Sequence, residues 1–316
     1  MKKIIRIGLA LLAVGVTPVF AADYPTKPVR FIIAFPPGSA TDVVGRIYTQ
    51  KLSEFWGKTV IPDNRGGAGG SIAAAIAARA IPDGYTLLMN SSAHAVNPSI
   101  YAKLPYDTLK DFVDIGPLAQ QPNVLVVHPS SPHKSVADLI AAAKSKSPNL
   151  ASAGVGSGTH LNLEKFAYMA KIKINHIAYK GSGEALTDVI GGRVDGFFAP
   201  ISAGIGHIQS GKARALAVST IKRSSALPNI PTIAESGIPN FDFSLWFGIW
   251  APAGTPPAIV NKIAQDTKRA GAELKDKLVT LGNDPMDMTP AQFAKFVREE
   301  IATSAVLLKA AGIQPQ

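Results

Sequence analysis

The chain has 316 residues, of which 47% are hydrophobic and 17% are charged, and its formal net charge is +10. This composition excludes a disordered or fibrous protein and allows one large or two ordinary domains. The chain has no cysteine, which excludes disulfides and thiolate metal sites. The Lys and Arg residues are scattered rather than clustered with aromatic residues. We therefore expect no nucleic acid as a partner, and the positive charge favours small anions.

Residues 1–21 have the pattern of a secretory signal. Basic residues precede an apolar run from Ile7 to Phe20, and Ala21 ends a site that signal peptidase reads. The apolar run is too short to span a membrane comfortably, and no later segment is long enough. We therefore expect export to the periplasm, with cleavage near Ala21 and no lipid anchor.

The first predicted strand, Val29–Phe35, leads through a Pro/Gly turn into a helix with one apolar stripe. Thr41 or Asp42 is expected to cap this helix, because short side-chain oxygens satisfy free N–H groups of the first turn. The free N–H groups of Ser39, Ala40 and Thr41 would then favour a carboxylate or phosphate, helped by the helix dipole. A capped turn without a ligand stays the alternative.

The next elements continue this alternation. We predict a strand at Val60–Ile61, a small-residue helix at Ile72–Ala80 and a strand at Thr86–Met89. Strands that alternate with helices indicate a mainly parallel sheet, in which ligands bind beyond the carboxyl ends of the strands. The loop that holds Ser92 and His94 is therefore expected beside the opening turn.

A second series of strands and helices follows the apolar strand Asn123–His128. A late apolar strand, Phe243–Ala251, precedes the terminal helices, of which the last is expected at Pro290–Ala310 because Thr289-Pro290 is a good start signal. Two series joined by two extended strands predict two lobes around a hinge. The expected boundaries are 22–123 plus 246–316 for the first lobe and 124–245 for the second.

Motifs for catalysis and cofactor binding are incomplete. Gly156-Ser157-Gly158 lacks the spacing of a nucleophile elbow, and Gly57-Lys58-Thr59 has Leu52 where a P-loop needs Gly. The run Gly66-Gly67-Ala68-Gly69-Gly70 is followed by Ile72 where a dinucleotide fingerprint needs a third Gly. The histidines show no metal-ligand spacing. We therefore expect no catalytic residue, no cofactor and no metal site.

Four turns combine a strand end, small hydroxyl or Gly residues and a helix start, at 39–41, 91–93, 157–159 and 181–183. Together they predict a cleft of backbone N–H and hydroxyl donors that holds a carboxylate between two lobes. His94 and His160, expected in loops at strand ends, either donate hydrogen bonds to this anion or are structural.

Ordered motifs along almost the whole mature chain carry a family resemblance: Phe35-Pro36-Pro37-Gly38-Ser39-Ala40-Thr41-Asp42, Asn64-Arg65-Gly66-Gly67-Ala68-Gly69-Gly70, Pro82-Asp83-Gly84-Tyr85-Thr86-Leu87-Leu88, Lys103-Leu104-Pro105-Tyr106-Asp107, Pro122-Asn123-Val124-Leu125-Val126-Val127, Tyr179-Lys180-Gly181, Gly191-Gly192-Arg193-Val194-Asp195 and Trp246-Phe247-Gly248. With these motifs the chain resembles the substrate-binding proteins of tripartite tricarboxylate transporters, the Bug-type periplasmic receptors.

The resemblance implies a two-lobed α/β periplasmic binding protein of the Venus-flytrap, type II-like fold, each lobe a mainly parallel sheet flanked by helices. It implies a monomer without catalytic activity that captures a small organic carboxylate and delivers it to the membrane permease subunits. This carboxylate is a mono- or dicarboxylate, and aromatic carboxylates are among the candidates. The residue pattern and the resemblance together give an expected substrate-binding set: Ser39, Ala40, Thr41, Asp42, Ser92, His94, Gly158, Thr159, His160, Gly181, Ala199 and Pro200.

Two departures from the family pattern bear on the ligand. Ser39 stands where the family often has Gly, and Ala199-Pro200 stands where many relatives carry an Asp that faces the ligand. The missing acid argues against an amino-acid ligand and favours a plain or aromatic carboxylate. Two alternatives stay open: an exported hydrolase or isomerase on the same scaffold, and a receptor whose liganded form docks on a membrane sensor kinase.

Overall fold

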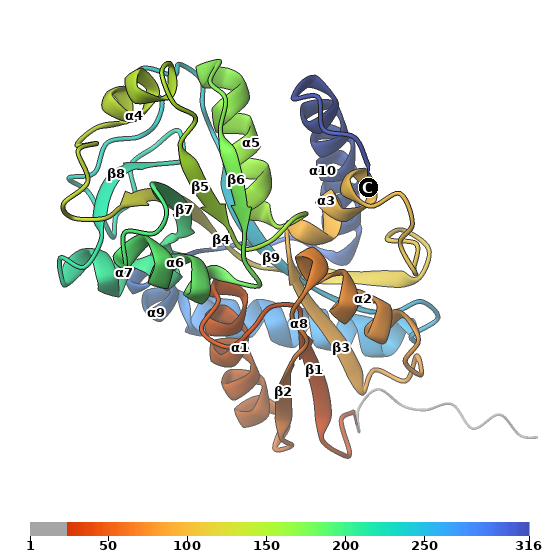
Figure 1. The fold of residues 1–316 in the computed structure, drawn as a ribbon. Coiled ribbons are helices and arrows are strands. Elements are labelled where there is room, and N and C mark those ends of the chain that lie inside the picture. Colours follow the sequence, from red (N-terminus) through yellow and green to blue (C-terminus); the bar gives the residue numbers. More distant parts are fainter. Residues whose placement is uncertain (1–23, 316) are drawn as a thin grey trace, which may run out of the picture.

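The computed structural model describes residues 24–315, and its helices and strands form two lobes (Figure 1). The expected signal peptide, residues 1–21, lies outside the described residues. In Figure 1 the red-to-orange strands of the first lobe lie at the bottom, and the green elements of the second lobe lie at the upper left. Within residues 24–315, no helix is both long and apolar enough to cross a bilayer.

The two lobes share one long strand, β4 (Phe112–Val127), which leaves the first sheet and enters the second. The first sheet has the order β2 (Val60–Asn64), β1 (Val29–Ile33), β3 (Thr86–Ser91), β9 (Ser244–Pro252) and β4, with β10 (Asp284–Pro285) also on β4. The second sheet has the order β4, β7 (Gly196–Pro200), β5 (Asn149–Ser152) and β6 (Asn175–Ala178), with β8 (Arg214–Val218) also on β4.

The expected two-lobed α/β fold is confirmed, and the structure refines the strand directions. Strands β1, β2 and β3 are parallel, as are β5, β6 and β7, whereas every strand paired with β4 runs antiparallel to it. The parallel pairing expected for each lobe is therefore found away from β4, in the part of each sheet whose carboxyl ends can hold a ligand.

Helices flank both sheets. Their bounds are α1 (Ala40–Trp56), α2 (Ser71–Ala78), α3 (Ala93–Ile100), α4 (Val136–Ala143), α5 (Gly158–Ala170), α6 (Ser182–Ile190), α7 (Ile201–Gln209), α8 (Pro257–Glu273), α9 (Lys275–Thr280) and α10 (Pro290–Ala310), and a 3-10 turn at Ala68–Gly70 precedes α2. The expected last helix is confirmed, because Thr289 and Gln292 form a capping box at its start.

Helix α1 is capped two or three residues earlier than expected. Ser39 is the N-cap: its backbone is extended, and its Oγ accepts a hydrogen bond from the Asp42 N–H at 3.3 Å. Thr41 and Asp42, the expected caps, lie inside the first helical turn. The apolar stripe was correctly predicted, since Val44 and Leu52 are fully buried in the core of the first lobe.

The predicted strand at Asn123–His128 is only the last part of β4. Gly116 and Pro117 interrupt the apolar pattern upstream, and the pairing with β9 shifts register on both sides of them, between Asp114 and Gly116 and between Pro117 and Ala119. Glycine and proline disfavour a regular strand, and here local irregularities in the hydrogen bonding between β4 and β9 accommodate them.

The chain passes from the second lobe back to the first just before β9. Strand β9 pairs only within the first sheet, so the crossing lies upstream of it. Hydrogen bonds join the two connections there: the Asn123 N–H donates to Ser219 Oγ at 2.9 Å, and Ser219 Oγ donates to the Phe243 carbonyl at 2.7 Å. These residues form the hinge region. The boundaries 22–123 plus 246–316 and 124–245 stay a proposal.

Candidate functional site

A small cavity between the lobes lies where several helices begin. It is lined by Phe35, Ser39, Ala40, Thr41, Ser91, Ala153, Ser157, Gly158, Thr159, Ser182, Pro200 and Leu245. Its volume of about 20 Å³ is close to the space that one water molecule needs. The lobes are therefore closed on each other, and a larger ligand requires them to separate slightly.

The first wall of the cavity is the start of α1. The Ser39 N–H, expected to be free, donates to the Pro36 carbonyl at 3.2 Å. Among the described residues no acceptor is bonded to the N–H groups of Ala40 and Thr41. Two free N–H groups at a helix start, together with the positive end of the helix dipole, favour an anion at this position.

Asp42 does not line the cavity, contrary to the expectation that it contacts the substrate. Its carboxylate accepts hydrogen bonds from the Gly38 N–H, from Arg46 Nε and from Asn64 Nδ2, each at 2.9 Å. Asn64 Nδ2 also donates to the Phe35 carbonyl at 2.8 Å. Asp42 therefore holds the turn from behind, and its charge is neutralised by Arg46.

The opposite wall is the start of α5, where Ser157 is the N-cap. Its Oγ accepts from the His160 N–H at 3.2 Å, and Thr159 Oγ1 accepts from the Ala153 N–H at 2.8 Å. Within residues 24–315, no acceptor is bonded to the N–H groups of Gly158 and Thr159. The second wall thus repeats the arrangement of the first.

Two further helix starts complete the second wall. Ser182 at the first position of α6 and Pro200 before α7 line the cavity. Gly181, expected to contact the substrate, instead packs against the first lobe: a Cβ there would lie 3.1 Å from Pro36 Cδ. Ala199 is buried in β7 and does not line the cavity.

The lining contains no charged side chain. The lining offers only neutral donors and helix dipoles, and these favour an anion even though no cationic side chain is present. The sequence pattern missed Phe35, Ala153 and Leu245, because apolar residues at strand ends resemble ordinary core residues. It also missed that Ser91 rather than Ser92 lines the cavity.

His94 is not a cleft residue, contrary to the expectation. It lies in the first turn of α3, fully buried, with its ring 4.5 Å from that of Trp250 and 4.9 Å from that of Phe112. Burial in this apolar cluster lowers the pKa of His94 to about 3. A neutral imidazole enclosed by aromatic rings contributes to packing, and it does not reach the anion position.

His160 also points away from the cavity. Its ring stacks on that of His176 with centroids 4.2 Å apart, and its Nε2 lies 3.4 Å from Glu164 Oε1. Desolvation, with a smaller effect of His160, lowers the pKa of His176 to about 4. Position three of α5 faces β6, a direction that the sequence alone could not show.

The lobes contact each other around the cavity. A Cβ on Gly158 would lie 2.5 Å from Ser92 Oγ and would also collide with Leu245. The Tyr101 hydroxyl donates to the Val155 carbonyl at 2.9 Å. Gly158 and Val155 belong to the second lobe, whereas Ser92 and Tyr101 belong to the first. Leu245 lies on β9, which pairs in the first sheet, although the proposed boundary at residue 245 counts it with the second lobe. Ser92, an expected substrate contact, is therefore part of the closure surface.

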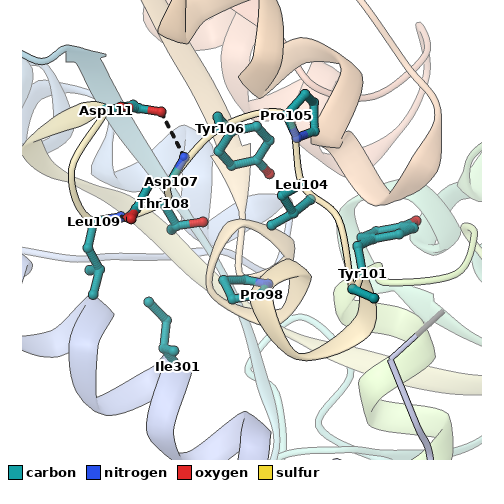
Figure 2. Close-up of a pocket in the computed structure, with 11 residues that line it drawn as sticks. Pro98, Tyr101, Leu104, Pro105, Tyr106, Asp107, Thr108, Leu109, Asp111 and Ile301 are labelled. Carbon is teal, nitrogen blue, oxygen red and sulfur yellow. Dashed lines mark hydrogen bonds between the residues drawn. The ribbon is translucent and has the colours of Figure 1, made fainter.

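A larger pocket of about 610 Å³ lies outside the cleft, between the segment after α3 and helix α10 (Figure 2). Asp107, Asp111 and Tyr106 line it, and the Asp107 N–H donates to Asp111 Oδ2 at 2.7 Å. Its lining includes carboxylates and no basic side chain. This pocket therefore offers carboxylate oxygens, one of them paired with Lys110 at 3.0 Å, and not the free N–H donors found at the small cavity.

A sequence model described as "Tripartite tricarboxylate transporter family receptor" matches residues 44–313. The chain belongs to this receptor family. Members of the family are periplasmic solute-binding receptors rather than enzymes. The resemblance expected from the sequence motifs is thus confirmed.

Similar proteins agree with this assignment. BugT of Bordetella pertussis is 37% identical to this receptor over 313 residues, covering 97% of this chain and 96% of BugT. An R. palustris structure with adipate has a TM-score of 0.90 and 35% identity, covering 93% of this chain and all of that chain (100%). MatC from Rhodopseudomonas palustris with bound malate has a TM-score of 0.85 and 28% identity, covering 90% and 100% of the two chains.

Proposed function

We propose that this receptor captures a small organic dicarboxylate between its lobes and delivers it to the membrane subunits of a tripartite tricarboxylate transporter. The observation that carries the proposal is the opposition of two anion positions across one cavity. Ala40 and Thr41 supply free N–H groups from the first lobe, and Gly158 and Thr159 supply them from the second. One carboxylate at each position would make the ligand join the lobes, and the contacts to both would supply the free energy of closure.

The rest of the lining suits the middle of such a ligand. Phe35, Leu245 and Pro200 are apolar, so they favour a hydrocarbon segment between the carboxylates. Adipate and malate, the ligands of two similar structures, are both dicarboxylates. No acidic side chain lines the cavity, which argues against a ligand with an ammonium group.

We also propose that the cavity has no catalytic activity. Its hydroxyl groups, on residues such as Ser157 and Thr159, have no histidine or carboxylate among the lining residues to act as a base. The exported form would begin near Ala22 after signal cleavage and would act as a monomer, since the proposed ligand is enclosed by one chain. Docking on a membrane sensor kinase stays the alternative to transport, because both would use the same closed lobes.

A thermal-shift screen of mono-, di- and tricarboxylates tests this function. A ligand at 100 times its dissociation constant stabilises the folded protein by about 2.7 kcal/mol, which for a chain of this size raises Tm by about 4 °C. We expect dicarboxylates to give the largest shifts. A screen in which no carboxylate raises Tm, or in which the bound compound is turned over, would contradict the proposal.

A further inference from the structure

A cluster of metal-ligating side chains lies on the second lobe, outside the cleft. His160 and Glu164 are one turn apart on α5, and His176 lies on the adjacent strand β6. Each side chain offers one ligand atom, and these atoms lie within 4.8 Å of one another. The cavity lining includes none of the three, so the proposed carboxylate site does not use them.

The distances suit a small divalent cation. Nitrogen and oxygen ligands lie about 2.0–2.2 Å from Zn²⁺, so two ligands of a tetrahedral site are about 3.4 Å apart. His160 Nε2 and Glu164 Oε1 already have this separation, 3.4 Å. Metal binding at Nε2 would move the imidazole proton to Nδ1, so it would replace the 3.3 Å hydrogen bond that Nδ1 accepts from the Gly156 N–H. The wider separations in the cluster, up to 4.8 Å, need small shifts of Glu164 and His176, both of which are only partly buried.

Neighbouring groups orient the ligands and leave an entry path. Ser152 Oγ lies 2.6 Å from His176 Nε2, so Nδ1 is the nitrogen of this ring that would bind a metal, with Ser152 orienting the ring through the other nitrogen. Glu164 and His176 also line a groove of about 540 Å³ that is bordered by Tyr168 and by Ala310 at the end of α10. An ion can therefore reach the cluster from solvent while the lobes are closed.

We propose that His160, Glu164 and His176 form a binding site for one divalent transition-metal ion, with Zn²⁺ as the best match. Two imidazoles and one carboxylate are a ligand set that Zn²⁺ takes with water in the fourth position. The ion would join α5 to β6 at the third position of α5, directly behind the residues that form the second wall of the cavity. It would therefore hold the second wall in place without touching the proposed ligand.

Calorimetric titration of the untagged, EDTA-treated chain with ZnCl₂ tests this site. We expect one Zn²⁺ per chain, and each of H160Q, E164Q and H176Q should weaken binding at least about tenfold, since loss of a ligand costs more than loss of a group that orients it. H133Q, at a histidine outside the cluster, is the matched control and should bind as the unsubstituted chain does. Co²⁺ loading should give the visible absorption of a tetrahedral site, which the cluster variants should lack.

Absence of Zn²⁺ binding by the unsubstituted chain would overturn the proposal, and so would equal binding by the three cluster variants. Circular dichroism of each metal-free variant separates a lost ligand from a lost fold, and a variant that unfolds is replaced by H176N or E164A. Carboxylate binding is measured in EDTA, so failure of the metal site leaves the proposed receptor function to be judged separately.

Discussion

The Tyr101 hydroxyl in the first lobe donates a hydrogen bond of 2.9 Å to the Val155 carbonyl in the second lobe. Val155 lies in the turn between β5 and α5, so this bond places the start of α5 against the first lobe. The bond can form only when the lobes are close. It therefore stabilises the closed form relative to an open one.

Replacing Tyr101 by Phe removes this bond with little change in shape. The net free energy of such a bond is about 1 kcal/mol, so we expect Y101F to bind dicarboxylates up to about fivefold more weakly in calorimetric titration. Y168F is the control, because Tyr168 is exposed on α5. An affinity of Y101F equal to that of Y168F would show that the bond does not contribute to closure.

Gly158→Ala places a methyl group between the lobes. Its Cβ would lie 2.5 Å from Ser92 Oγ, and both Ser92 and Leu245 are buried, so they have little room to move. Overpacking costs about 1–3 kcal/mol, and we therefore expect affinity for dicarboxylates to fall roughly 5- to 150-fold. The Tm without ligand should change little, because an open form avoids the collision.

Gly183→Ala is the matched control for this substitution. Gly183 is also in the first turn of a second-lobe helix, but a Cβ there meets no heavy atom within 4 Å. G183A should bind as the unsubstituted chain does. If G158A and G183A bind equally well, the close contacts of Gly158 with Ser92 and Leu245 do not form in the liganded protein.

Ser39→Ala removes the N-cap side chain of α1. Ser39→Gly removes it too, but glycine is itself a favourable N-cap residue. We expect S39A to lower the free energy of unfolding by about 1 kcal/mol and S39G by only a few tenths. Urea denaturation without ligand measures both. Equal losses would mean that the bond from Asp42 N–H to Ser39 Oγ does not determine the start of the helix.

His94 makes stability depend on pH. Its pKa is lowered to about 3 in the folded protein and is about 6.5 when unfolded. Stability is therefore fully present above pH 6.5, and it is lost as pH falls toward 3 because the unfolded state binds the proton more readily. Protonation of this group alone therefore lowers the free energy of unfolding by about 2 kcal/mol between pH 7.5 and pH 5.

The variant H94L should lose this part of the pH dependence, with H207Q as the control. Each protein is compared with itself at pH 7.5 and pH 5 by urea denaturation in EDTA, so a constant packing cost cancels. His176 acts in the same direction, since its pKa is lowered to about 4. The part of the stability loss at low pH that comes from His176 should therefore remain in H94L. An unchanged pH dependence in H94L would contradict a neutral His94.

The sequence predicts those parts of the fold that local signals determine. The Thr289-Pro290 start of α10 and the apolar stripe of α1 are examples, because caps and periodicity act within a few residues. Strand β4 was only partly predicted, since the pairing that tolerates Gly116 and Pro117 comes from β9, more than a hundred residues away.

Site residues divide in the same way. Ala40, Thr41, Gly158 and Thr159 could be found from strand–turn–helix patterns, because free N–H groups follow from local backbone geometry. His94 and His160 could not be placed, since the direction of a side chain depends on how its helix packs. The convergence of His160 with His176 also depends on the neighbouring strand.

Amide chemical shifts measure the central claim most directly. In a ¹⁵N-labelled chain titrated with adipate, the account predicts that the amide protons of Ala40, Thr41, Gly158 and Thr159 move downfield together and saturate with one binding curve, as hydrogen bonds to carboxylate oxygens form. Hexanediamide, its uncharged analogue, should leave them in place. Binding of adipate that leaves these four amides unchanged and moves those around Tyr106 and Asp111 instead would contradict the proposed site.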